Sequence, residues 1–279
     1  MFLFCSLSWC VMPPSLQQQR LAALRHVIAD IERKPALSDP AKRLDSASTQ
    51  GFPVLPAGLV QEVFCDAQRD TGASLGFALA QAKALMSAKR PAVFYLQLEK
   101  DSQSLGLPYG PGLSSFGIDP RHLVIVRTAD MAEFLWAAEE IVSCRAVAAI
   151  VADVRGEPKL LNFTASRRLT MRASSNKVSL FMLRYGDRRE SSASALRWRL
   201  TPYRSGKNPY DDRGIGAARW RLQLEKGRIA GNQVEWLVEW TKNGIAVVAQ
   251  PANTNPWRFP TPVPGAQPAI LADRLSQAG

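Results

Sequence analysis

The sequence predicts an α/β protein: a mostly parallel sheet flanked by helices, followed by an antiparallel β meander at the C-terminal end of the core. Three observations predict this class. Apolar runs of strand length alternate with stretches of helical periodicity between residues 59 and 183, which is typical of a doubly wound sheet. The run at residues 147–151 is apolar at every position, as in a strand buried on both faces. After residue 218 the pattern changes to strict alternation, which indicates amphipathic antiparallel strands.

The composition indicates a soluble globular protein. The chain has 279 residues, of which 46% are hydrophobic, and this length can bury one substantial core. Its four cysteines form no CxxC pair and it has two histidines, so we expect no metal, no cofactor and reduced thiols in a cytoplasmic protein. The apolar residues 1–12 lack a basic flank and are too few to span a membrane, so neither a signal peptide nor a membrane partner is indicated. Met1 and Met12 are both compatible with the true start.

Four divisions of the chain are predicted. They are an N-terminal segment with an amphipathic helix at residues 1–34, a linker at 35–56, the core with its meander at 57–249, and a proline-rich disordered tail at 250–279. The apolar stripe of the N-terminal helix includes Leu24 and Ile28. Because a linker separates this helix from the core, the stripe could dock in a groove of a partner protein or pack on its own domain. Both alternatives stay open.

Strands and helices alternate through the first part of the core. The strands are expected at residues 59–65, 92–98, 123–126, 147–151 and 178–183, and the helices at 74–88, from Asp130 onward and around 163–173. Asp130 and Glu133 have the spacing of a capping box, which marks the start of the second helix. Apolar residues from Met131 to Val142 follow helical spacing, so that stripe is expected in the core.

The last third of the core predicts a three-strand meander. Trp220, Leu222 and Leu224 share one face of a strand, and Trp236, Val238 and Trp240 share one face of the next. The arginines and glutamates on the opposite faces are expected to pair across the strands. Asn243-Gly244 indicates a hairpin into residues 245–249. We therefore expect the tryptophans to be core residues, in preference to a platform on which bases stack.

The segment VFCDAQRDTGASLGFALAQAKAL, at residues 63–85, has the strand, turn and helix of a phosphate-binding loop without its chemistry. Such a loop uses glycines, a lysine and a hydroxyl to hold phosphates and magnesium. Here the turn has no lysine, and its side chains would present two carboxylates to a phosphate. The residues of this degenerate loop are Asp66, Arg69, Asp70, Gly72 and Ser74. We expect no nucleotide cofactor, no ATP hydrolysis and no catalytic residues, with Thr71 and Ser74 capping the helix instead.

Two catalytic alternatives were weighed against this expectation. Asp153 ends the fourth predicted strand, where a magnesium-binding carboxylate could lie, but without a phosphate loop it has little to coordinate. Residues 72–76 match the Gly-x-Ser-x-Gly pattern of a hydrolase, but Ser74 lies nine residues past Cys65 instead of directly after the strand. His122 opens a strand and offers Ser74 no recognisable partnership. Cys65 and Cys144 are expected to be small core residues.

The positive charge of the chain is concentrated in one block. Residues 155–228 hold 18 Lys and Arg against 6 Asp and Glu, whereas the remainder holds 17 against 18. Localised positive charge attracts polyanions or an acidic protein partner, although a solvated basic face is the simpler alternative. The candidate arginines for DNA or partner binding are Arg167, Arg168, Arg172, Arg197, Arg199, Arg219 and Arg221.

Several segments resemble a known family. They are YGPGLSSFGIDPRHLVIVRTADMAEFLWAAEEIVSCRAVAAIVADV at residues 109–154, FTASRRLTMRASSNKVSLFMLR at 163–184, and the pair ALRWRL and ARWRLQLEKGR. From about residue 16 to 240 the chain resembles the ImuA family, a RecA-like group sometimes labelled SulA-like. The resemblance implies a RecA-like core and a degraded phosphate loop. It also implies partners: the inactive polymerase relative ImuB, a DnaE-type error-prone polymerase and RecA.

The leading functional hypothesis is a non-catalytic adaptor in SOS-induced error-prone translesion DNA synthesis. The resemblance implies this role, in the cytoplasm and with the nucleoid during DNA damage. A module that binds single-stranded DNA weakly is a second hypothesis, because the basic block suits either role. A residual nucleotide-dependent switch and a cell-division inhibitor are further alternatives, and the lysine-free turn counts against the switch.

Overall fold

The computed structural model describes residues 52–53, 55–208, 210–211, 213–229 and 234–248. The predicted N-terminal helix with Leu24 and Ile28, most of the predicted linker and the predicted tail lie outside the described residues. The helices are α3 (Thr71–Leu85), α4 (Glu99–Leu105), α5 (Gly110–Ser115), α6 (Met131–Ser143) and α7 (Phe163–Asn176), with 3-10 turns η1 (Gln68–Asp70) and η2 (Pro120–His122). The strands are β1 (Val60–Cys65), β2 (Ala92–Leu98), β3 (Leu123–Thr128), β4 (Val147–Asp153), β5 (Ser179–Tyr185), β6 (Leu196–Tyr203), β7 (Arg219–Lys226), β8 (Glu235–Thr241) and β9 (Gly244–Val247).

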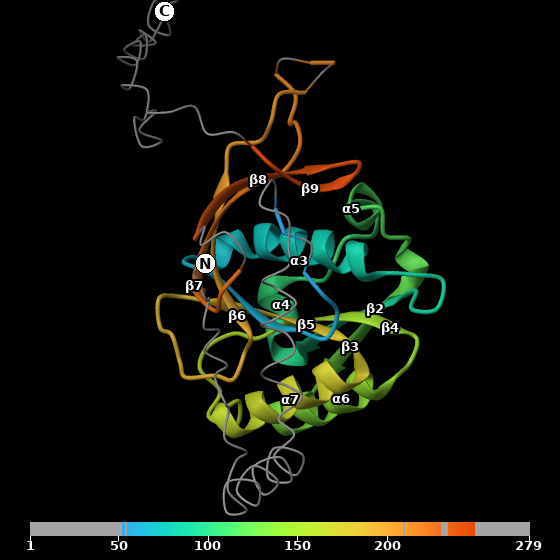
Figure 1. Cartoon of the computed structure of the whole chain (residues 1–279), viewed down its shortest axis with the longest axis vertical. Helices are drawn as coiled ribbons and strands as arrows, with labels where there is room; N and C mark the ends of the chain where they lie inside the picture. The colour runs from blue at the N-terminus through green and yellow to red at the C-terminus, as the bar shows by residue number, and fades with distance from the viewer. Residues whose placement is uncertain (1–51, 54, 209, 212, 230–233, 249–279) are drawn as a thin grey trace, which may run out of the picture. The chain divides into compact units, whose positions relative to one another are not determined.

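These strands form one sheet in the order β3-β2-β4-β5-β1-β6-β7-β8-β9 (Figure 1). β1 pairs in parallel with β5 on one side and with β6 on the other. β6 then pairs antiparallel with β7, which begins the meander β7-β8-β9. The predicted fold class is confirmed: an α/β protein with a mostly parallel sheet, flanking helices and C-terminal antiparallel strands.

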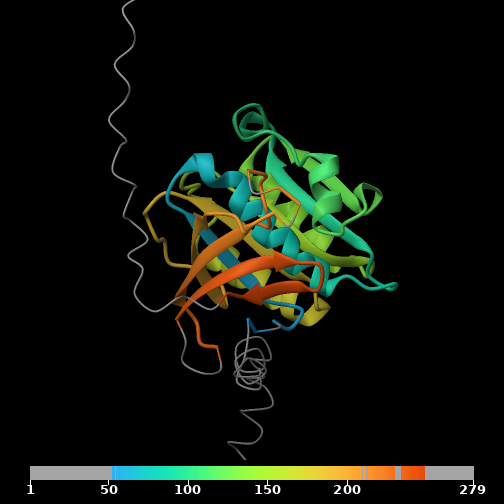
Figure 2. The ribbon, with the colours of Figure 1, turned by 90° about the horizontal axis from the view of Figure 1, so that it is seen from above.

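α3 lies between the parallel sheet and the antiparallel strands, which curve over it (Figures 1 and 2). Its centre is enclosed on every side, and even Ser74 and Gln81 are buried. Gly76 permits close packing here, because a Cβ at this position would lie 2.9 Å from Cζ of Phe116 and 3.4 Å from Cζ2 of Trp220. α3 is therefore packed tightly within the core.

The predicted core role of the tryptophans is confirmed for Trp220 and Trp236, whereas Trp240 is only partly buried. Trp198, Trp220 and Trp236 are buried around Phe77 of α3. The rings of Trp198 and Trp236 lie 5.7 Å apart, and those of Phe77 and Trp220 lie 5.9 Å apart, both near T-shaped. Large aromatic side chains contribute most of the apolar area in such a core. They are not available to stack on bases.

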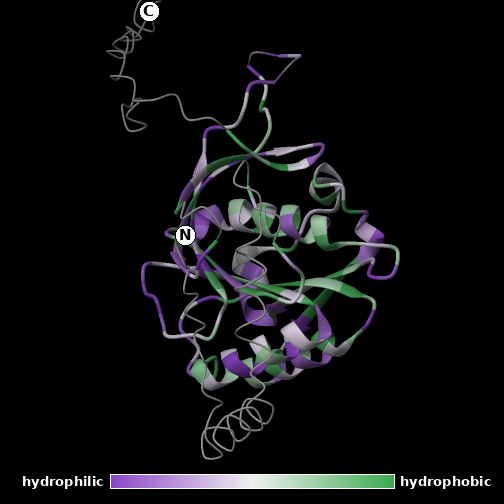
Figure 3. Ribbon diagram, in the orientation of Figure 1, coloured by the Kyte–Doolittle hydropathy of each residue, from purple (hydrophilic) through white to green (hydrophobic). Residues whose placement is uncertain are grey.

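The opposite face of the sheet is covered by α6 and α7 (Figure 1). The Asp130 carboxylate caps α6 by accepting hydrogen bonds from the backbone N–H groups of Ala132 and Glu133, both at 2.9 Å. The apolar stripe of α6 from Met131 to Val142 is buried as predicted. Figure 3 shows hydrophobic residues concentrated along the central strands, whereas these two helices carry hydrophilic residues as well.

Three expectations about local structure were wrong. α3 begins at Thr71, three residues before the predicted start, because η1 leads directly into it. Cys65 is buried as expected, but Cys144 is exposed, since it follows the last residue of α6 in a surface turn. The short helices α4 and α5 were not predicted. Among the described residues, no helix is long and apolar enough to cross a bilayer.

Candidate functional site

The turn between β1 and α3 is where a phosphate loop would lie. Neither predicted cap of α3 forms: its N-cap is Asp70, and no side chain accepts a hydrogen bond from the N-cap turn. The Thr71 hydroxyl donates back to the Gln68 carbonyl, and the Ser74 hydroxyl donates to the Thr71 carbonyl at 3.0 Å. Both hydroxyls therefore donate to nearby backbone carbonyls. Neither residue is in the N-cap position, because both lie within the first turn of α3. Neither points to a ligand.

An ion pair covers the acidic side of this turn. Arg199 of β6 holds Asp66 in a two-pronged contact, with Nη2 to Oδ2 at 2.7 Å and Nε to Oδ1 at 3.1 Å. The Asp66 carboxylate already occupies the guanidinium face that a phosphate would use. Arg69 is exposed, and Gly72 has open space around the position of a Cβ, so neither closes around a ligand.

Two tyrosines donate hydrogen bonds to the carboxylate of Asp153, which lies at the end of β4. Tyr95 of β2 donates its hydroxyl to Oδ2 at 2.7 Å, and Tyr185 of β5 donates to Oδ1 at 2.9 Å. Burial, first of all, raises the pKa of Asp153. Burial and the nearby Asp153 carboxylate also raise the pKa of both tyrosines, which therefore remain hydroxyl donors. Each oxygen of the Asp153 carboxylate thus already accepts one hydrogen bond.

The polar interior beside Asp153 contains two buried acceptor oxygens without a hydrogen-bond partner among the described residues. Gln97 lies opposite Asp153 in the register of β2 and β4, and its buried Oε1 has no hydrogen-bond partner among the described residues. Oδ2 of Asp101 in α4 is likewise buried without a partner, and the Asp101 charge contributes to the raised pKa of Asp153. Ligands of open α/β sheets bind at this carboxyl edge. A phosphate there would meet oxygen acceptors, which repel it.

A substitution of Asp153 tests whether the negative charge of its carboxylate destabilises the folded protein. Because the folded-state pKa is raised, the folded protein binds the proton more tightly than the unfolded chain, and the free energy of unfolding falls as pH rises through that interval. Asp153→Asn removes the titration, while its cost in rearranged tyrosine hydroxyls is the same at every pH. In urea unfolding from pH 4 to 8, the variant should therefore gain stability relative to the natural chain as pH rises. A difference that is constant with pH, or that reverses, would show that the ionised carboxylate is stabilised.

The candidate arginines are mostly engaged in ion pairs. Six of the seven have a carboxylate partner: Arg168 and Arg172 with Glu139, Arg197 with Glu62, Arg199 with Asp66, Arg219 with Glu239, and Arg221 with Glu235. The predicted cross-strand pairing of the meander is confirmed by the last two. Only Arg167 lacks an ion pair to a described residue. A DNA phosphate would have to compete with a carboxylate at the other six.

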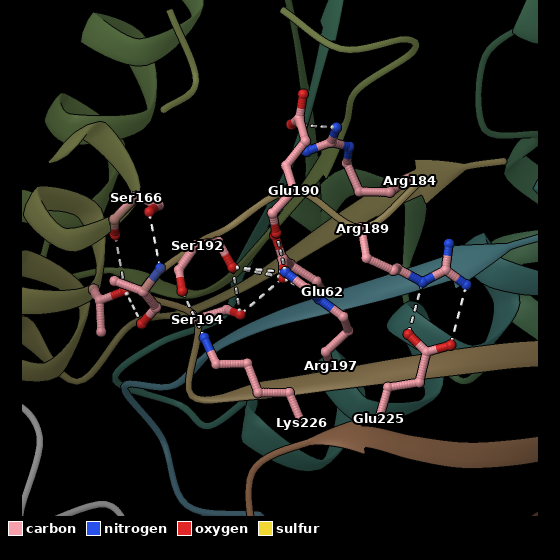
Figure 4. A network of polar contacts seen from close by, with 12 residues as sticks. Glu62, Ser166, Arg184, Arg189, Glu190, Ser192, Ser194, Arg197, Glu225 and Lys226 are labelled. Atoms are coloured by element: carbon pink, nitrogen blue, oxygen red, sulfur yellow. Dashed lines mark hydrogen bonds and ion pairs between the residues drawn. The ribbon is translucent and has the colours of Figure 1, made fainter. Parts of the chain in front are cut away.

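Glu62 lies at the centre of a buried polar network on β1 that was not predicted (Figure 4). Its Oε2 accepts from Nε of Arg197 and from the hydroxyls of Ser192 and Ser194, each at 2.8 Å. Arg197 continues to the Glu190 carbonyl at 2.6 Å. The contacts span more than 125 residues of sequence, so only the pairing of β1 with β6 reveals them. This network holds β6 against β1, where the parallel part of the sheet meets the antiparallel part.

α6, α7 and the segment before α7 carry several exposed apolar side chains. We use the name α6–α7 patch for these side chains together with the exposed Arg167; its members are Trp136, Leu160, Phe163, Arg167 and Met171. Trp136 is 64% exposed, and the other apolar members are also exposed. Phe163, Arg167 and Met171 follow one another at four-residue intervals along α7, so the unpaired guanidinium is flanked by apolar side chains. A shallow groove between the helices includes Trp136 and Leu160. Exposed clusters of this kind mark protein interaction sites.

The fold and these sites define a class: an α/β protein with a mostly parallel sheet, C-terminal antiparallel strands, and a lysine-free turn that leads from β1 into α3. Two curated relatives, both named Protein ImuA, come from two strains of Caulobacter vibrioides, NA1000 / CB15N and ATCC 19089 / CIP 103742 / CB 15. Each is 32% identical over 222 residues, which covers 75% of this chain and 85% of the relative. The chain belongs to the ImuA family. No family model matches it.

Proposed function

We propose that this chain is a non-catalytic adaptor in damage-induced, error-prone translesion DNA synthesis. Its partners in this proposal are an ImuB-like protein, a DnaE-type polymerase and RecA, and it acts at the nucleoid after DNA damage. Membership of the ImuA family supports the role in damage-induced mutagenesis. The adaptor role rests on the site itself.

The observation that carries the proposal is that Tyr95 and Tyr185 both donate hydrogen bonds to the buried Asp153 carboxylate. Magnesium at Asp153 would compete with two buried hydrogen bonds, and a triphosphate that used Arg199 would also have to displace Asp66 from it. The turn supplies no lysine to offset these costs. The sheet and α3 then serve as a RecA-like scaffold that presents contact surfaces.

The α6–α7 patch is the surface we assign to the ImuB-like partner. Exposed aromatic and aliphatic side chains around one unpaired arginine suit an apolar protein surface with an acidic residue. They suit a DNA backbone less well, because phosphates require several available cations and Arg168 and Arg172 share Glu139. The patch therefore favours the adaptor over the DNA-binding alternative.

Calorimetry with Mg-ATP tests the closed site. Titration of the full chain should give no saturable heat, because the phosphate and magnesium positions are filled from within. The matched control is a double variant, Ser74→Ala with Asp153→Asn, which removes the two side chains that a nucleotide-bound magnesium would need. Tight binding by the natural chain that this variant loses would overturn the proposal.

A further inference from the structure

A cavity of about 330 Å³ lies on the side of α3 away from the turn of the closed nucleotide site. Its wall is formed by the second half of α3, the residues that follow α5, and the hairpin between β8 and β9. This volume is about twice that of an engineered cavity that holds benzene and is at the lower end of known ligand pockets. The cavity is thus large enough for one small ligand or for one or two bulky side chains.

The wall of the cavity is mainly apolar. Phe116 and Trp240 contribute rings whose centres lie 5.5 Å apart, and Leu85 and Ile245 add aliphatic surface. The indole N–H of Trp240 is already bonded to the Ser115 carbonyl at 2.8 Å. The ring therefore offers a ligand its apolar surface. This wall fits an aromatic or branched aliphatic group.

One buried donor in the wall has no partner. Gln81 of α3 is 7% exposed, and its Nε2 forms no hydrogen bond with a described residue. Gln61, another amide of the wall, accepts a hydrogen bond from the indole N–H of Trp198 at 2.9 Å through its Oε1. Burying a donor unpaired costs free energy, so natural proteins rarely do it without a reason. A ligand oxygen in the cavity would satisfy this group.

Two lysines complete the polar part of the cavity. Lys83 and Lys242 both line it, and neither has an ion pair to a described residue. Lys83 reaches its position across Gly117, where a Cβ would lie 3.3 Å from the lysine Cε, and Gly117 has a φ of +69°. Two exposed lysines without an ion pair to a described residue thus line the same cavity as the unpartnered amide donor of Gln81. An anionic acceptor suits all three.

We infer that this cavity binds an apolar carboxylate: one bulky apolar or aromatic group with a single carboxylate, which accepts from Gln81 Nε2 and from the ammonium groups of Lys83 and Lys242. Two sources supply this chemistry, a free small acid and the C-terminal residue of a polypeptide. The site is separate from the α6–α7 patch and does not depend on the adaptor role.

Fluorescence titration of the full chain with the anionic apolar dye 1-anilinonaphthalene-8-sulfonate tests this inference. We expect saturable binding, with octanoate and N-acetyl-Leu-Phe as competitors. The uncharged counterparts, octanol and the C-terminal amide of the dipeptide, should compete at least tenfold less well, because they lack the charge that the lysines recognise. Stronger competition by octanoate points to a free acid, and stronger competition by the dipeptide points to a chain terminus.

Three variants distinguish binding in the cavity from adsorption of the dye and the competitors elsewhere on the protein. Gln81→Leu, Lys83→Gln and Lys242→Gln should each weaken the better competitor about tenfold, whereas the exposed Lys89→Gln should leave it unchanged. Gln81→Leu should also keep or raise the melting temperature, since it removes an unpaired buried donor, so loss of binding there does not reflect unfolding. The inference is overturned by a lack of saturable binding, by equal competition from the uncharged compounds, or by binding that the three variants leave intact.

Discussion

Arg197→Met should lower the free energy of unfolding by about 3–5 kcal/mol, because it removes the cation that is hydrogen-bonded to the buried Glu62 carboxylate. The Glu62 side chain is 3% exposed and that of Arg197 11% exposed, so water cannot replace the lost partner. The hydroxyls of Ser192 and Ser194 still donate to Glu62, but they carry no charge. Methionine matches the apolar stem of arginine, which limits the cavity that the substitution creates. Urea unfolding at neutral pH measures the change.

Two variants distinguish a buried charge from a general loss of packing on β6. Glu62→Gln combined with Arg197→Met should be more stable than Arg197→Met alone, because no unpaired charge remains. Arg199→Met is the matched control on the same strand: its ion pair with Asp66 is 46% exposed on both sides, and its loss should cost less than about 1 kcal/mol. Equal losses for Arg197→Met and Arg199→Met would mean that the network contributes nothing specific.

A charged α6–α7 patch should abolish damage-induced mutation. In Trp136→Glu with Phe163→Asp, two exposed apolar side chains of the proposed partner surface become carboxylates. Loss of one aromatic anchor commonly costs an interface about 2–4 kcal/mol, and desolvation of the new charges adds to it. Mutation frequency after ultraviolet damage should fall to that of cells lacking the chain, while growth without damage stays normal. The ImuB-like protein should also be absent when the variant is purified from damaged cells.

Trp136→Glu with Phe163→Asp should not destabilise the fold. Phe163 is the first residue of α7, where a carboxylate is favourable, and glutamate is a good helix former at Trp136. Tyr210→Asp with Ile215→Glu provides a charge-matched control, because both residues are exposed in the loop between β6 and β7. A normal frequency of damage-induced mutation in the patch variant would show that the α6–α7 patch does not bind the partner. Loss in both double variants would point to charge in general.

Most of the fold could be predicted because its elements have strong local signals. α6 has its Asp130 cap and an apolar stripe, and β4 is apolar throughout, so period and capping suffice. The start of α3 was missed because η1 runs into it, and α4 and α5 because seven and six residues are too few to show a period. The place of β6 beside β1 depends on pairing between distant segments, which alternation alone does not specify.

The sequence shows which residue types the turn between β1 and α3 contains, but not which side chains come together around it. A turn without lysine is visible in the sequence, and it led to the expectation of no phosphate chemistry. The two hydrogen bonds to Asp153 were not visible, because Tyr95 and Tyr185 reach it only through the order of β2, β4 and β5. The basic block likewise gave no sign that Arg197 would pair with Glu62, since net charge does not reveal partners.

The most direct test of the adaptor role is the frequency of ultraviolet-induced mutation in cells whose only copy carries Ser74→Ala with Asp153→Asn. These changes remove the hydroxyl and the carboxylate on which any nucleotide-dependent step would rely, and they leave the α6–α7 patch intact. Protein amounts are matched to those of the natural chain by immunoblot. If the chain acts by contact alone, the variant should mutate at the natural frequency. A fall to the frequency of cells lacking the chain, at a normal protein amount, would contradict this account.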